Sequence, residues 1–299
     1  MAILIGADVG GSKTAVGVSE GGDVLARAEG PGAAVRPGRA LASASVIAEV
    51  VRGALGDLGR LIGDVLVVGA AGAGRDPERE ELRRALRGES LADRVVVTTD
   101  IEIALAGAFE HGPGIVVSAG TGSIAVGRDR TGRRVRIGGY GWQMGDEGSG
   151  YAIGRAALGA VSRAHDGRSP GTALSDRVLE AARSPDFDAL VRWAAGASPA
   201  EIAALAPHVL DVAAQGDVLA QGIADYAARE LSQLAICLLP MMEVDLPVGV
   251  AVTGGLLGGN QPLRRSVLAR LGEQPAFRTN DDRVDPVVGA LRLARAEGR

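Results

Sequence analysis

The chain has 299 residues and is long enough for two domains, because a single hydrophobic core stops growing at about 250 to 300 residues. Its net charge is −4 and it has no basic stripe, so we expect no nucleic-acid partner. The single cysteine, Cys237, excludes a disulfide framework, a cysteine-rich zinc site and a cysteine-ligated iron–sulfur cluster within one chain.

The sequence has neither a secretory signal pattern at its start nor an apolar run of about 18 residues, the length that a membrane span needs. We therefore expect a cytoplasmic protein without a membrane partner. Glycine is abundant, at 45 residues, and it occurs in short clusters along the chain. Such clusters predict tight turns and places where the backbone approaches a ligand closely.

The first third of the chain predicts the element order β-β-β-α-β-α-β-α. Strands are expected at 3–8, 14–19, 24–28, 65–69 and 95–99, and helices at 39–60, 76–87 and 101–109. Asp76, which is followed by proline, is typical of a helix start with the aspartate as N-cap.

The strand pattern then begins again. Strands are expected at 115–118, 124–127, 135–138, 248–253 and 275–279, and helices in a long region from 148 to 240, from 262 onward and at 285–296. Three strands joined by glycine turns, followed by alternating helices and strands, thus occur twice. The repeat is one of fold and not of sequence, because the two copies align poorly.

The richest motif is the turn that follows the first strand, in the segment Asp8–Thr14. Its glycines let backbone N–H groups approach an anion, and the hydroxyls of Ser12 and Thr14 add donors. Lys13, the only lysine of the chain, adds a positive charge. The carboxylate of Asp8 could hold Mg²⁺, directly or through water. Taken alone, an ordinary glycine hairpin is the alternative interpretation.

A second turn of glycines and hydroxyls, Gly120-Thr121-Gly122-Ser123, is also followed by a strand. Neither turn is a P-loop or a Rossmann fingerprint, because both of those patterns open a helix. The run Gly69–Gly74 does precede a helix, but its glycine spacing does not fit G-x-G-x-x-G. Two phosphate-type hairpins, each opening one half of a duplicated fold, predict two lobes that hold a polyphosphate between them.

These motifs resemble those of the N-acetylglucosamine kinase and BadF/BadG/BcrA/BcrD ATPase family, within the sugar kinase, hsp70 and actin superfamily. The resemblance is carried by Gly6–Thr14, Ser118–Ser123, Gly138–Gly150, Val252–Leu256 and, in the last helix, Pro286, Gly289 and Ala290. The matches cover the whole chain, and the segment Gly138–Gly150 is the most diagnostic of them.

The resemblance implies an α/β fold with two actin-like, ribonuclease H-like lobes around a nucleotide cleft. The N-terminal lobe is expected at 1–112, completed by the C-terminal helix 285–299, and the second lobe, with a helical insertion, at 113–284. ATP and Mg²⁺ are the implied cofactors and a sugar is the implied substrate. A homodimer is expected from the resemblance alone, because the sequence itself does not indicate an oligomeric state.

The resemblance also implies roles for single residues. Asp100 matches the catalytic base of the family, although a helix N-cap is an equal alternative from its spacing alone. Asp146 matches the aspartate that binds sugar hydroxyls, again with an N-cap as the alternative. Trp142 is expected either to wall the sugar or to pack on the hairpin. Gly72 lies in a loop expected to face an acetamido group.

Asp8 is expected to bind the metal ion, and the nucleotide is expected to contact Gly10, Gly11, Ser12, Lys13, Thr14, Gly120, Thr121, Gly122, Ser123, Gly254 and Gly255. Thr121 and Gly122 are also expected to contact the sugar.

The cysteine content separates the branches of the family. Its dehydratase-activating ATPases carry cysteines for an iron–sulfur cluster at a dimer interface, and a related repressor–kinase group carries a cysteine-rich zinc loop. Cys237 alone supports neither the cluster nor the zinc loop, and its apolar helical surroundings predict a core position.

The sequence thus predicts an ATP:sugar phosphotransferase acting on the 6-hydroxyl of an amino sugar, with N-acetylglucosamine preferred to glucosamine. A regulatory ATPase without a sugar acceptor and a non-catalytic sugar sensor are the alternatives.

Overall fold

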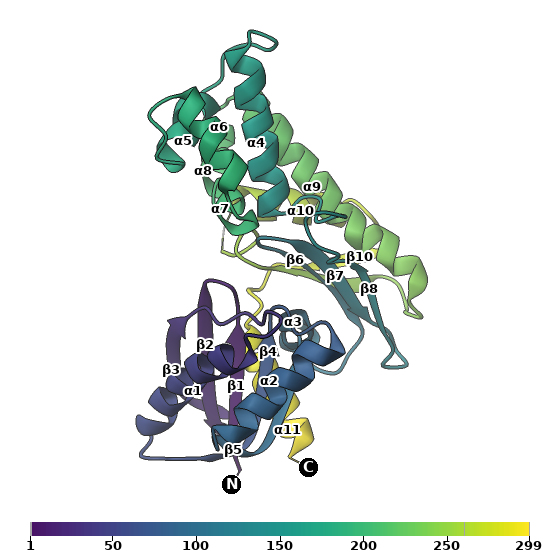
Figure 1. Cartoon of the computed structure of the whole chain (residues 1–299). Coiled ribbons are helices and arrows are strands. Elements are labelled where there is room, and N and C mark those ends of the chain that lie inside the picture. Colours follow the sequence, from purple (N-terminus) through teal and green to yellow (C-terminus); the bar gives the residue numbers. More distant parts are fainter. Residues whose placement is uncertain (1, 260, 299) are drawn as a thin grey trace. The chain divides into compact units, whose positions relative to one another are not determined.

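The computed structural model describes residues 2–259 and 261–298 (Figure 1). Contacts within the chain divide it into two compact units, Met1–Gly112 with Val284–Arg299, and Pro113–Arg283. In the described part of the chain, each unit is built on one five-stranded sheet.

The first unit has a sheet in the order β3-β2-β1-β4-β5. Its elements are β1 (Ile3–Val9), β2 (Lys13–Glu20), β3 (Asp23–Pro31), α1 (Ala40–Gly56), β4 (Gly63–Ala70), α2 (Asp76–Gly88), β5 (Ala92–Thr98), α3 (Asp100–Phe109) and α11 (Pro286–Glu297). β1 is antiparallel to β2 and parallel to β4, and β4 is parallel to β5. The carboxyl ends of β1, β4 and β5 therefore lie at the same edge of the sheet, where ligands of α/β folds bind.

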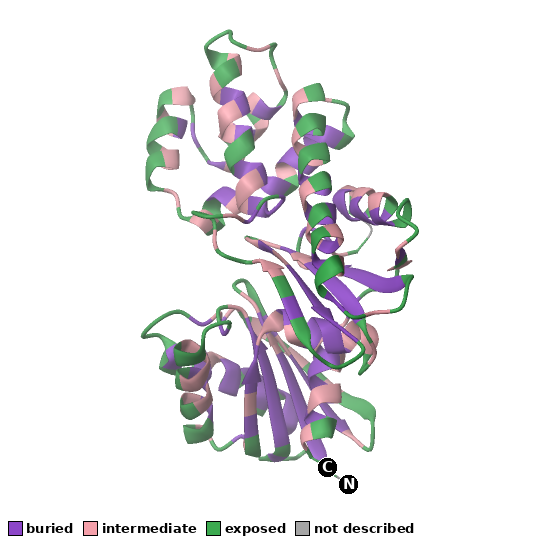
Figure 2. Cartoon of the chain, turned by 90° about the vertical axis from the view of Figure 1, so that its right-hand side faces the viewer, coloured by how far each residue is buried: buried purple, intermediate pink, exposed green. Residues whose placement is uncertain are grey.

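The strands β1, β2 and β4 are buried along most of their length, whereas the edge strand β3 is largely exposed (Figure 2). Because side chains alternate along a strand, Ile3 and Ile5 of β1 pack with α1 and α2, whereas Leu4 packs with α3 and α11. The result is a sheet between two helical layers.

The helices α3 and α11 approach each other closely because each has a glycine at the contact. A Cβ atom at Gly289 would lie 1.8 Å from the carbonyl oxygen of Ile103, and one at Gly107 would lie 2.6 Å from that of Asp285. No side chain fits at either position. The close approach sets where the N-terminal ends of both helices lie, and these ends carry Asp100 and Asp285.

The second unit has a sheet in the order β10-β9-β6-β7-β8, covered by the remaining helices. Its elements are β6 (Gly114–Ala119), β7 (Ser123–Arg128), β8 (Arg134–Gly138), α4 (Gly150–His165), α5 (Leu174–Ala181), α6 (Phe187–Gly196), α7 (Pro199–Ala203), α8 (Ala206–Ala214), α9 (Val218–Leu238), the 3₁₀ helix η1 (Leu239–Met241), β9 (Val248–Thr253), α10 (Pro262–Gly272) and β10 (Phe277–Asn280). α9 packs along β6, β7 and β8, and one hydrophobic core joins this sheet to the helices. β6 has antiparallel β7 on one side and parallel β9 on the other, which repeats the arrangement around β1.

The predicted elements are present, and the long helical region becomes α4 to α9 with η1. Two local predictions are wrong. The N-cap of α2 is Arg75 and not Asp76, and no side chain caps this helix. Cys237 is exposed and not in the core, because it lies on the outer side of α9, where its sulfur is 3.8 Å from the side-chain oxygen of Gln233.

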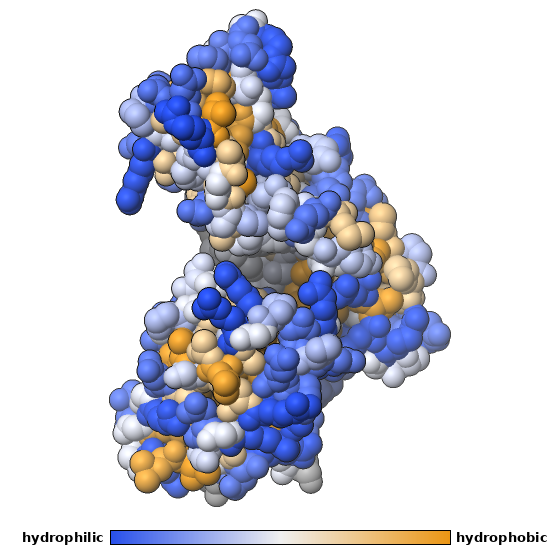
Figure 3. Space-filling view, in the orientation of Figure 1, coloured by the Kyte–Doolittle hydropathy of each residue, from blue (hydrophilic) through white to orange (hydrophobic). Residues whose placement is uncertain are grey.

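The surface drawn in Figure 3 is mostly polar, with apolar side chains in small separate patches. Among the described residues no single helix is long and apolar enough to cross a membrane. The two helical segments Pro199–Ala214 and Val218–Met241 are together long and apolar enough, but the chain bends by 118° between them.

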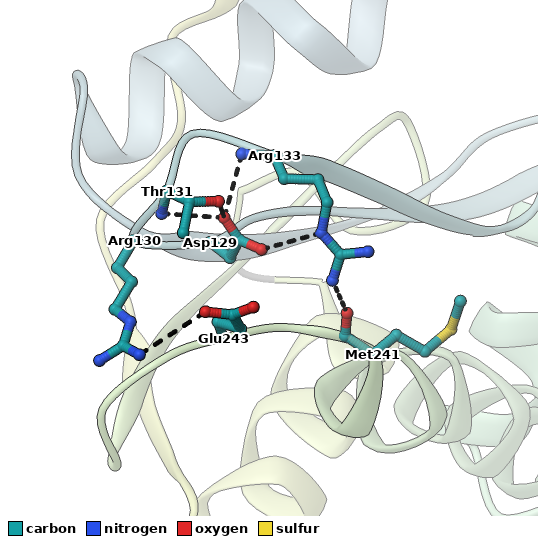
Figure 4. Close-up of polar contacts among 6 residues, drawn as sticks. All are labelled: Asp129, Arg130, Thr131, Arg133, Met241 and Glu243. Atoms are coloured by element: carbon teal, nitrogen blue, oxygen red, sulfur yellow. Dashed lines mark hydrogen bonds and ion pairs between the residues drawn. The ribbon is translucent and has the colours of Figure 1, made fainter.

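Asp129, in the turn between β7 and β8, is the centre of a polar cluster that holds this turn to η1 and the residues after it (Figure 4). Its carboxylate accepts hydrogen bonds from the Thr131 hydroxyl at 2.6 Å and from the Arg133 Nε at 3.2 Å, as well as from the backbone N–H groups of both residues. Arg133 also donates to the Met241 carbonyl. The hydrogen bond from Thr131, helped by Arg133, lowers the pKa of Asp129 to about 2.

Gly289→Ala should destabilise the protein by about 1 to 3 kcal/mol, because the added methyl group overpacks the contact between α3 and α11. Gly53→Ala in α1 is the matched control, since a Cβ atom there meets no described atom within 4 Å. That change should stabilise the protein by about 0.5 to 1 kcal/mol through helix propensity. Urea unfolding of both variants measures the difference, and equal shifts would contradict the predicted contact.

Asp129→Asn should lower the urea midpoint of unfolding at neutral pH, because an amide has one acceptor oxygen where the carboxylate has two. The folded-state pKa of about 2 lies below the ordinary value of 3.8. The stabilisation by the carboxylate is therefore fully present above that ordinary value and is lost as the pH falls toward the folded value. The difference between the variant and the unchanged protein should shrink when the measurement is repeated at about pH 3.

Asp23→Asn is the control for this prediction, because Asp23 lies exposed at the corresponding turn between β2 and β3. It should leave the midpoint nearly unchanged at both pH values. A loss of stability in Asp129→Asn that is the same at both pH values would show that the charge of Asp129 contributes nothing.

Candidate functional site

The first glycine turn lies between β1 and β2. The chain segment that follows β3 packs against it and supports it. Within the turn, the Gly10 N–H donates to the Lys13 carbonyl at 2.9 Å, and the Gly10 carbonyl accepts from the Ala33 N–H at 3.1 Å. A Cβ atom at Gly32 would lie 2.2 Å from the Gly11 carbonyl oxygen, so only glycine permits this support. Gly11 itself is exposed, as the predicted approach of an anion to the backbone requires.

The side chains of this turn divide into exposed and buried ones. Ser12 and Lys13 are exposed, and Lys13 forms an ion pair with Glu29 on β3. Thr14 is fully buried, and its hydroxyl has no hydrogen-bond partner among the described residues. The alternation of β2 turns its side chain inward, and the role of Thr14 as a donor in the turn stays a prediction.

The second glycine turn, between β6 and β7, is fixed to the start of α4. The Gly120 carbonyl accepts from the Gly150 N–H at 2.8 Å, and the Thr121 carbonyl accepts from the Tyr151 N–H at 3.2 Å. Thr121 is exposed, whereas Ser123 is buried and its hydroxyl donates to the Glu147 carbonyl at 2.8 Å. The Ser123 hydroxyl is thus already paired within the unit, and the expected contact of Ser123 with the nucleotide stays a prediction. Each turn thus presents one exposed hydroxyl.

Asp146 lies under the second turn and is buried, with 7% of its surface exposed. Its Oδ1 accepts from the Ser123 N–H at 3.3 Å, and a Cβ atom at Gly122 would lie 2.7 Å from its Oδ2. Burial raises the pKa of Asp146, against the hydrogen bond from Ser123. The backbone of Asp146 has a φ of 65°, a strained value for a non-glycine residue. The sequence did not reveal this support of the turn, and the expected contact with sugar hydroxyls stays a prediction.

The alternative role of Asp146 as a helix cap is excluded, because Ser149 is the N-cap of α4 and accepts from the Ala152 N–H at 3.2 Å.

Trp142 lies in the same loop as Asp146 and is 43% exposed. Its ring packs on Tyr151 of α4 with the centroids 5.1 Å apart and the planes tilted by 49°. Trp142 therefore packs against a helix and still offers a large apolar surface to solvent.

Asp100 begins α3, yet it is not the cap of that helix. The N-cap is Thr99, whose hydroxyl accepts from the Glu102 N–H at 3.3 Å. The Asp100 carboxylate accepts from the Ile101 N–H at 3.0 Å and is half-buried at the carboxyl end of β5. Burial raises the pKa of Asp100. The N-cap alternative thus fails, and the carboxylate remains available for chemistry.

Asp8, the last residue but one of β1, belongs to the same group of carboxylates. Its pKa is raised to about 6, first by burial, then by the negative charges of Asp100 and Asp285, with Lys13 acting in the opposite direction. Asp285 is the N-cap of α11; it accepts from the Val287 N–H at 3.0 Å and from Arg27 at 2.7 Å.

Asp285 was given no role from the sequence. The available signal was the pair Asp285-Pro286, which is the helix-start pattern that was assigned to Asp76. The pattern holds at α11, where Asp285 is itself the extended N-cap residue, and fails at α2, where the extended N-cap residue is Arg75 and Asp76 is already helical.

Gly72 and Gly254 occupy equivalent places after β4 and β9, and both have positive φ, at 87° and 96°. A Cβ atom at Gly72 would lie 2.2 Å from the Val35 carbonyl oxygen, and one at Gly254 would lie 2.3 Å from that of Ala119. Both glycines are therefore required by the fold. Gly255, the next residue, faces open space and remains free for a ligand.

The predicted site residues fall into one group per unit. In the first unit, Asp8 and Asp100 interact electrostatically at the edge that carries the first glycine turn. In the second unit, Asp146 contacts the turn at Gly122, and Gly254 contacts the strand that enters the same turn. Each group combines an acidic residue with a glycine turn.

The first group fits a magnesium ion. Asp8 is a hard oxygen ligand, and its pKa is raised first by burial and then by the negative charges of Asp100 and Asp285. A bound cation favours the ionised carboxylate. Mg²⁺ is typically held by one or two carboxylates together with water and substrate phosphates.

Comparison with known proteins decides the family. The sequence pattern of the BadF/BadG/BcrA/BcrD ATPase family matches residues 5–294. The chain belongs to this family. Its fold is the two-lobed, actin-like α/β fold that was predicted.

Three members of known description are similar over nearly their whole length. An N-acetylmuramic acid/N-acetylglucosamine kinase of Clostridium acetobutylicum is 30% identical, covering 99% of both chains. An N-acetyl-D-glucosamine kinase of Dictyostelium discoideum is 29% identical, covering 98% of this chain and 97% of that one. A Chromobacterium violaceum protein of known structure, provisionally assigned as an N-acetylglucosamine kinase, is 28% identical with a TM-score of 0.82, covering 98% and 99%.

In this BadF/BadG/BcrA/BcrD family member, Lys13→Ala should weaken nucleotide binding by about tenfold or more, the scale of one hydrogen bond to a charged group. Folding stability should hardly change, since both partners of the ion pair are largely exposed. Calorimetric titration with ATP measures the affinity. Glu29→Gln is the control, because it breaks the same ion pair and keeps the lysine. Equal losses in both variants would show that Lys13 acts only through Glu29.

Proposed function

We propose that this chain is an ATP:sugar phosphotransferase that transfers the γ-phosphoryl group of ATP to the 6-hydroxyl of an amino sugar, with N-acetylglucosamine as the preferred acceptor. The observation that carries the proposal is the state of Asp100, a half-buried carboxylate with a raised pKa that caps no helix. The names of the Clostridium and Dictyostelium relatives support the same acceptor.

Asp100 has the properties of a general base. A raised pKa brings a carboxylate closer to the pKa that proton transfer near neutral pH requires. In the proposed reaction Asp100 accepts the proton of the sugar 6-hydroxyl while the hydroxyl oxygen forms a bond to the γ-phosphorus. The bond from that phosphorus to the bridging oxygen breaks, and ADP leaves with the electron pair. The side chain of Asp100 also orients the hydroxyl before it reacts.

The two glycine turns are assigned to the phosphates. Phosphoryl transfer depends mainly on alignment and on neutralisation of charge, and exposed backbone N–H groups with a hydroxyl provide both. In the first turn the N–H groups of Gly11 and Ser12 and the ammonium of Lys13 take this role, because the Gly10 N–H already donates to the Lys13 carbonyl. In the second turn Thr121 takes it, because the Gly120 N–H already donates to the Gly122 carbonyl. The hydroxyls of Thr14 and Ser123 are buried.

Mg²⁺ is proposed as the metal ion, with Asp8 as the side chain that would hold it. When bound, the ion would neutralise charge on the phosphate oxygens. Asp8 must be ionised to bind it, and the pKa of about 6 in the metal-free protein means that metal binding releases protons below neutral pH.

The sugar specificity is assigned to the loop after β4 and to Asp146. Gly72 is exposed, and the loop from Gly69 to Arg75 has no acidic side chain that would favour a free amine. Its N–H groups and small side chains suit an acetamido group, which places N-acetylglucosamine above glucosamine and glucosamine above glucose. N-acetylmuramic acid is a further acceptor to test, since the Clostridium relative is named for both sugars.

A regulatory ATPase without a sugar acceptor is the second candidate, and it is favoured by the family name alone. Coupled assays with each of these sugars and without sugar decide between the two. The proposal predicts phosphate transfer that depends on sugar, with the highest kcat/KM for an N-acetylated sugar, since that ratio measures differential transition-state binding. ATP hydrolysis at the same rate without sugar would overturn the proposal.

The cytoplasmic location and the homodimer stay predictions.

Asp100→Asn should lower kcat for sugar phosphorylation by about 10²- to 10⁴-fold, the usual contribution of a general base. The KM values for ATP and sugar should change much less, because the amide keeps the size and one acceptor of the carboxylate. In the unchanged protein kcat/KM should fall as the pH is lowered, because Asp100 becomes protonated, and the raised pKa places this fall above the range of an ordinary aspartate.

Asp93→Asn is the matched control, an exposed aspartate on the strand that leads to Asp100. Its kcat should equal that of the unchanged protein. If Asp100→Asn keeps near-normal kcat, Asp100 is not the base.

A further inference from the structure

Arg264 is a buried cation whose recorded partners are all backbone carbonyls. It lies near the start of α10 and is 7% exposed. Its Nη1 donates to the carbonyls of Val252 and Leu257, both at 3.1 Å, and its Nη2 to those of Asp281 and Asp282 at 2.9 and 3.4 Å. Within residues 2–259 and 261–298 it forms no ion pair with a carboxylate. The dipoles of the four carbonyl groups therefore compensate the positive charge of the guanidinium group.

The four carbonyls belong to three separate segments of the second unit. Val252 is near the end of β9, Leu257 ends the turn that contains Gly254 and Gly255, and residues 281–282 follow β10. A guanidinium group has a rigid planar fork of N–H donors that can reach several acceptors at once, whereas a lysine ammonium offers its donors from one point. Arginine is thus the side chain that can hold these three segments together.

The turn from Gly254 to Leu257 has two independent supports. On one side, Gly254 lies against the end of β6, where the Leu256 N–H donates to the Ala119 carbonyl at 3.1 Å. On the other side, Arg264 binds the carbonyls of Val252 and Leu257. Gly255 has no neighbour on the side where its Cβ would lie. The two supports fix the conformation of the turn and leave Gly255 open to a ligand.

We propose that Arg264 is a positioning residue for nucleotide binding, which fixes the turn Gly254–Leu257 in the conformation that receives the adenosine without touching the nucleotide. This inference rests on the proposed function, which assigns Gly254 and Gly255 to the nucleotide. Loss of the fork leaves buried carbonyls without donors, and the turn relaxes to recover hydrogen bonds elsewhere.

Arg264→Lys tests the inference in the full-length protein. The variant keeps the charge and loses the fork. The KM for ATP should rise by about tenfold or more, the scale of one or two hydrogen bonds to a charged group. The KM for the sugar and kcat at saturating ATP should stay within about threefold, since Asp100 and the sugar loop are untouched. Arg270→Lys is the control on the same helix, because Arg270 makes only a partly exposed ion pair with Asp225 at 3.7 Å.

Arg264→Ala adds a readout that a purely structural role would not give. Guanidinium ions at a low, non-denaturing concentration should enter the space left by the side chain and lower the KM for ATP toward that of the unchanged protein. Sodium ions at the same concentration should not. If the alanine variant fails to fold, Arg264→Lys still carries the test.

Calorimetric binding of a non-hydrolysable ATP analogue separates this inference from the proposed function. Weaker binding to Arg264→Lys than to the unchanged protein supports the inference even if no sugar is phosphorylated. A lower melting temperature with unchanged affinity for the analogue would make Arg264 a structural residue only and overturn the inference. No binding of the analogue to the unchanged protein would overturn both.

Discussion

The structure depends on the close approach of backbone to backbone at a few glycines. At Gly32, Gly72, Gly254 and Gly289 a Cβ atom would lie between 1.8 and 2.3 Å from another residue's backbone oxygen. Three of these contacts support the turns that end β1, β4 and β9, and the fourth lets α3 and α11 pack together. These three turns are therefore built on backbone that only glycine permits, and their polar groups are held in place before any ligand arrives.

The two units contain the same kind of glycine turn. Each has a glycine turn between antiparallel strands, with one exposed hydroxyl and a second hydroxyl turned inward by the alternation of the strand. The inward hydroxyls differ, since Ser123 donates to a carbonyl and Thr14 has no partner among the described residues. The second turn also rests on Asp146, whereas the first rests on Gly32 and the chain beside it. Similar turns are thus stabilised by different contacts.

Charge is distributed unequally between the two groups of site residues. In the first unit the pKa of Asp8 is raised to about 6, first by burial and then by the negative charges of Asp100 and Asp285. Both effects disfavour the ionised carboxylate in the absence of a cation. In the second unit the guanidinium of Arg264 is buried and is compensated by carbonyl dipoles beside the proposed adenosine turn.

The sequence alone determined the element order, the duplicated arrangement and the two glycine turns, because these depend on local periodicity and on turn chemistry. It also placed Asp100 at a strand end. It could not decide whether Asp100 or Thr99 caps α3, since both residue types cap helices and only the backbone conformation separates them. The burial of Thr14 and Ser123, the contact of Asp146 with Gly122 and the four acceptors of Arg264 depend on segments far apart in the sequence. Tertiary packing decided these, because it alone sets which side chains lose contact with water and which carbonyls a long side chain reaches.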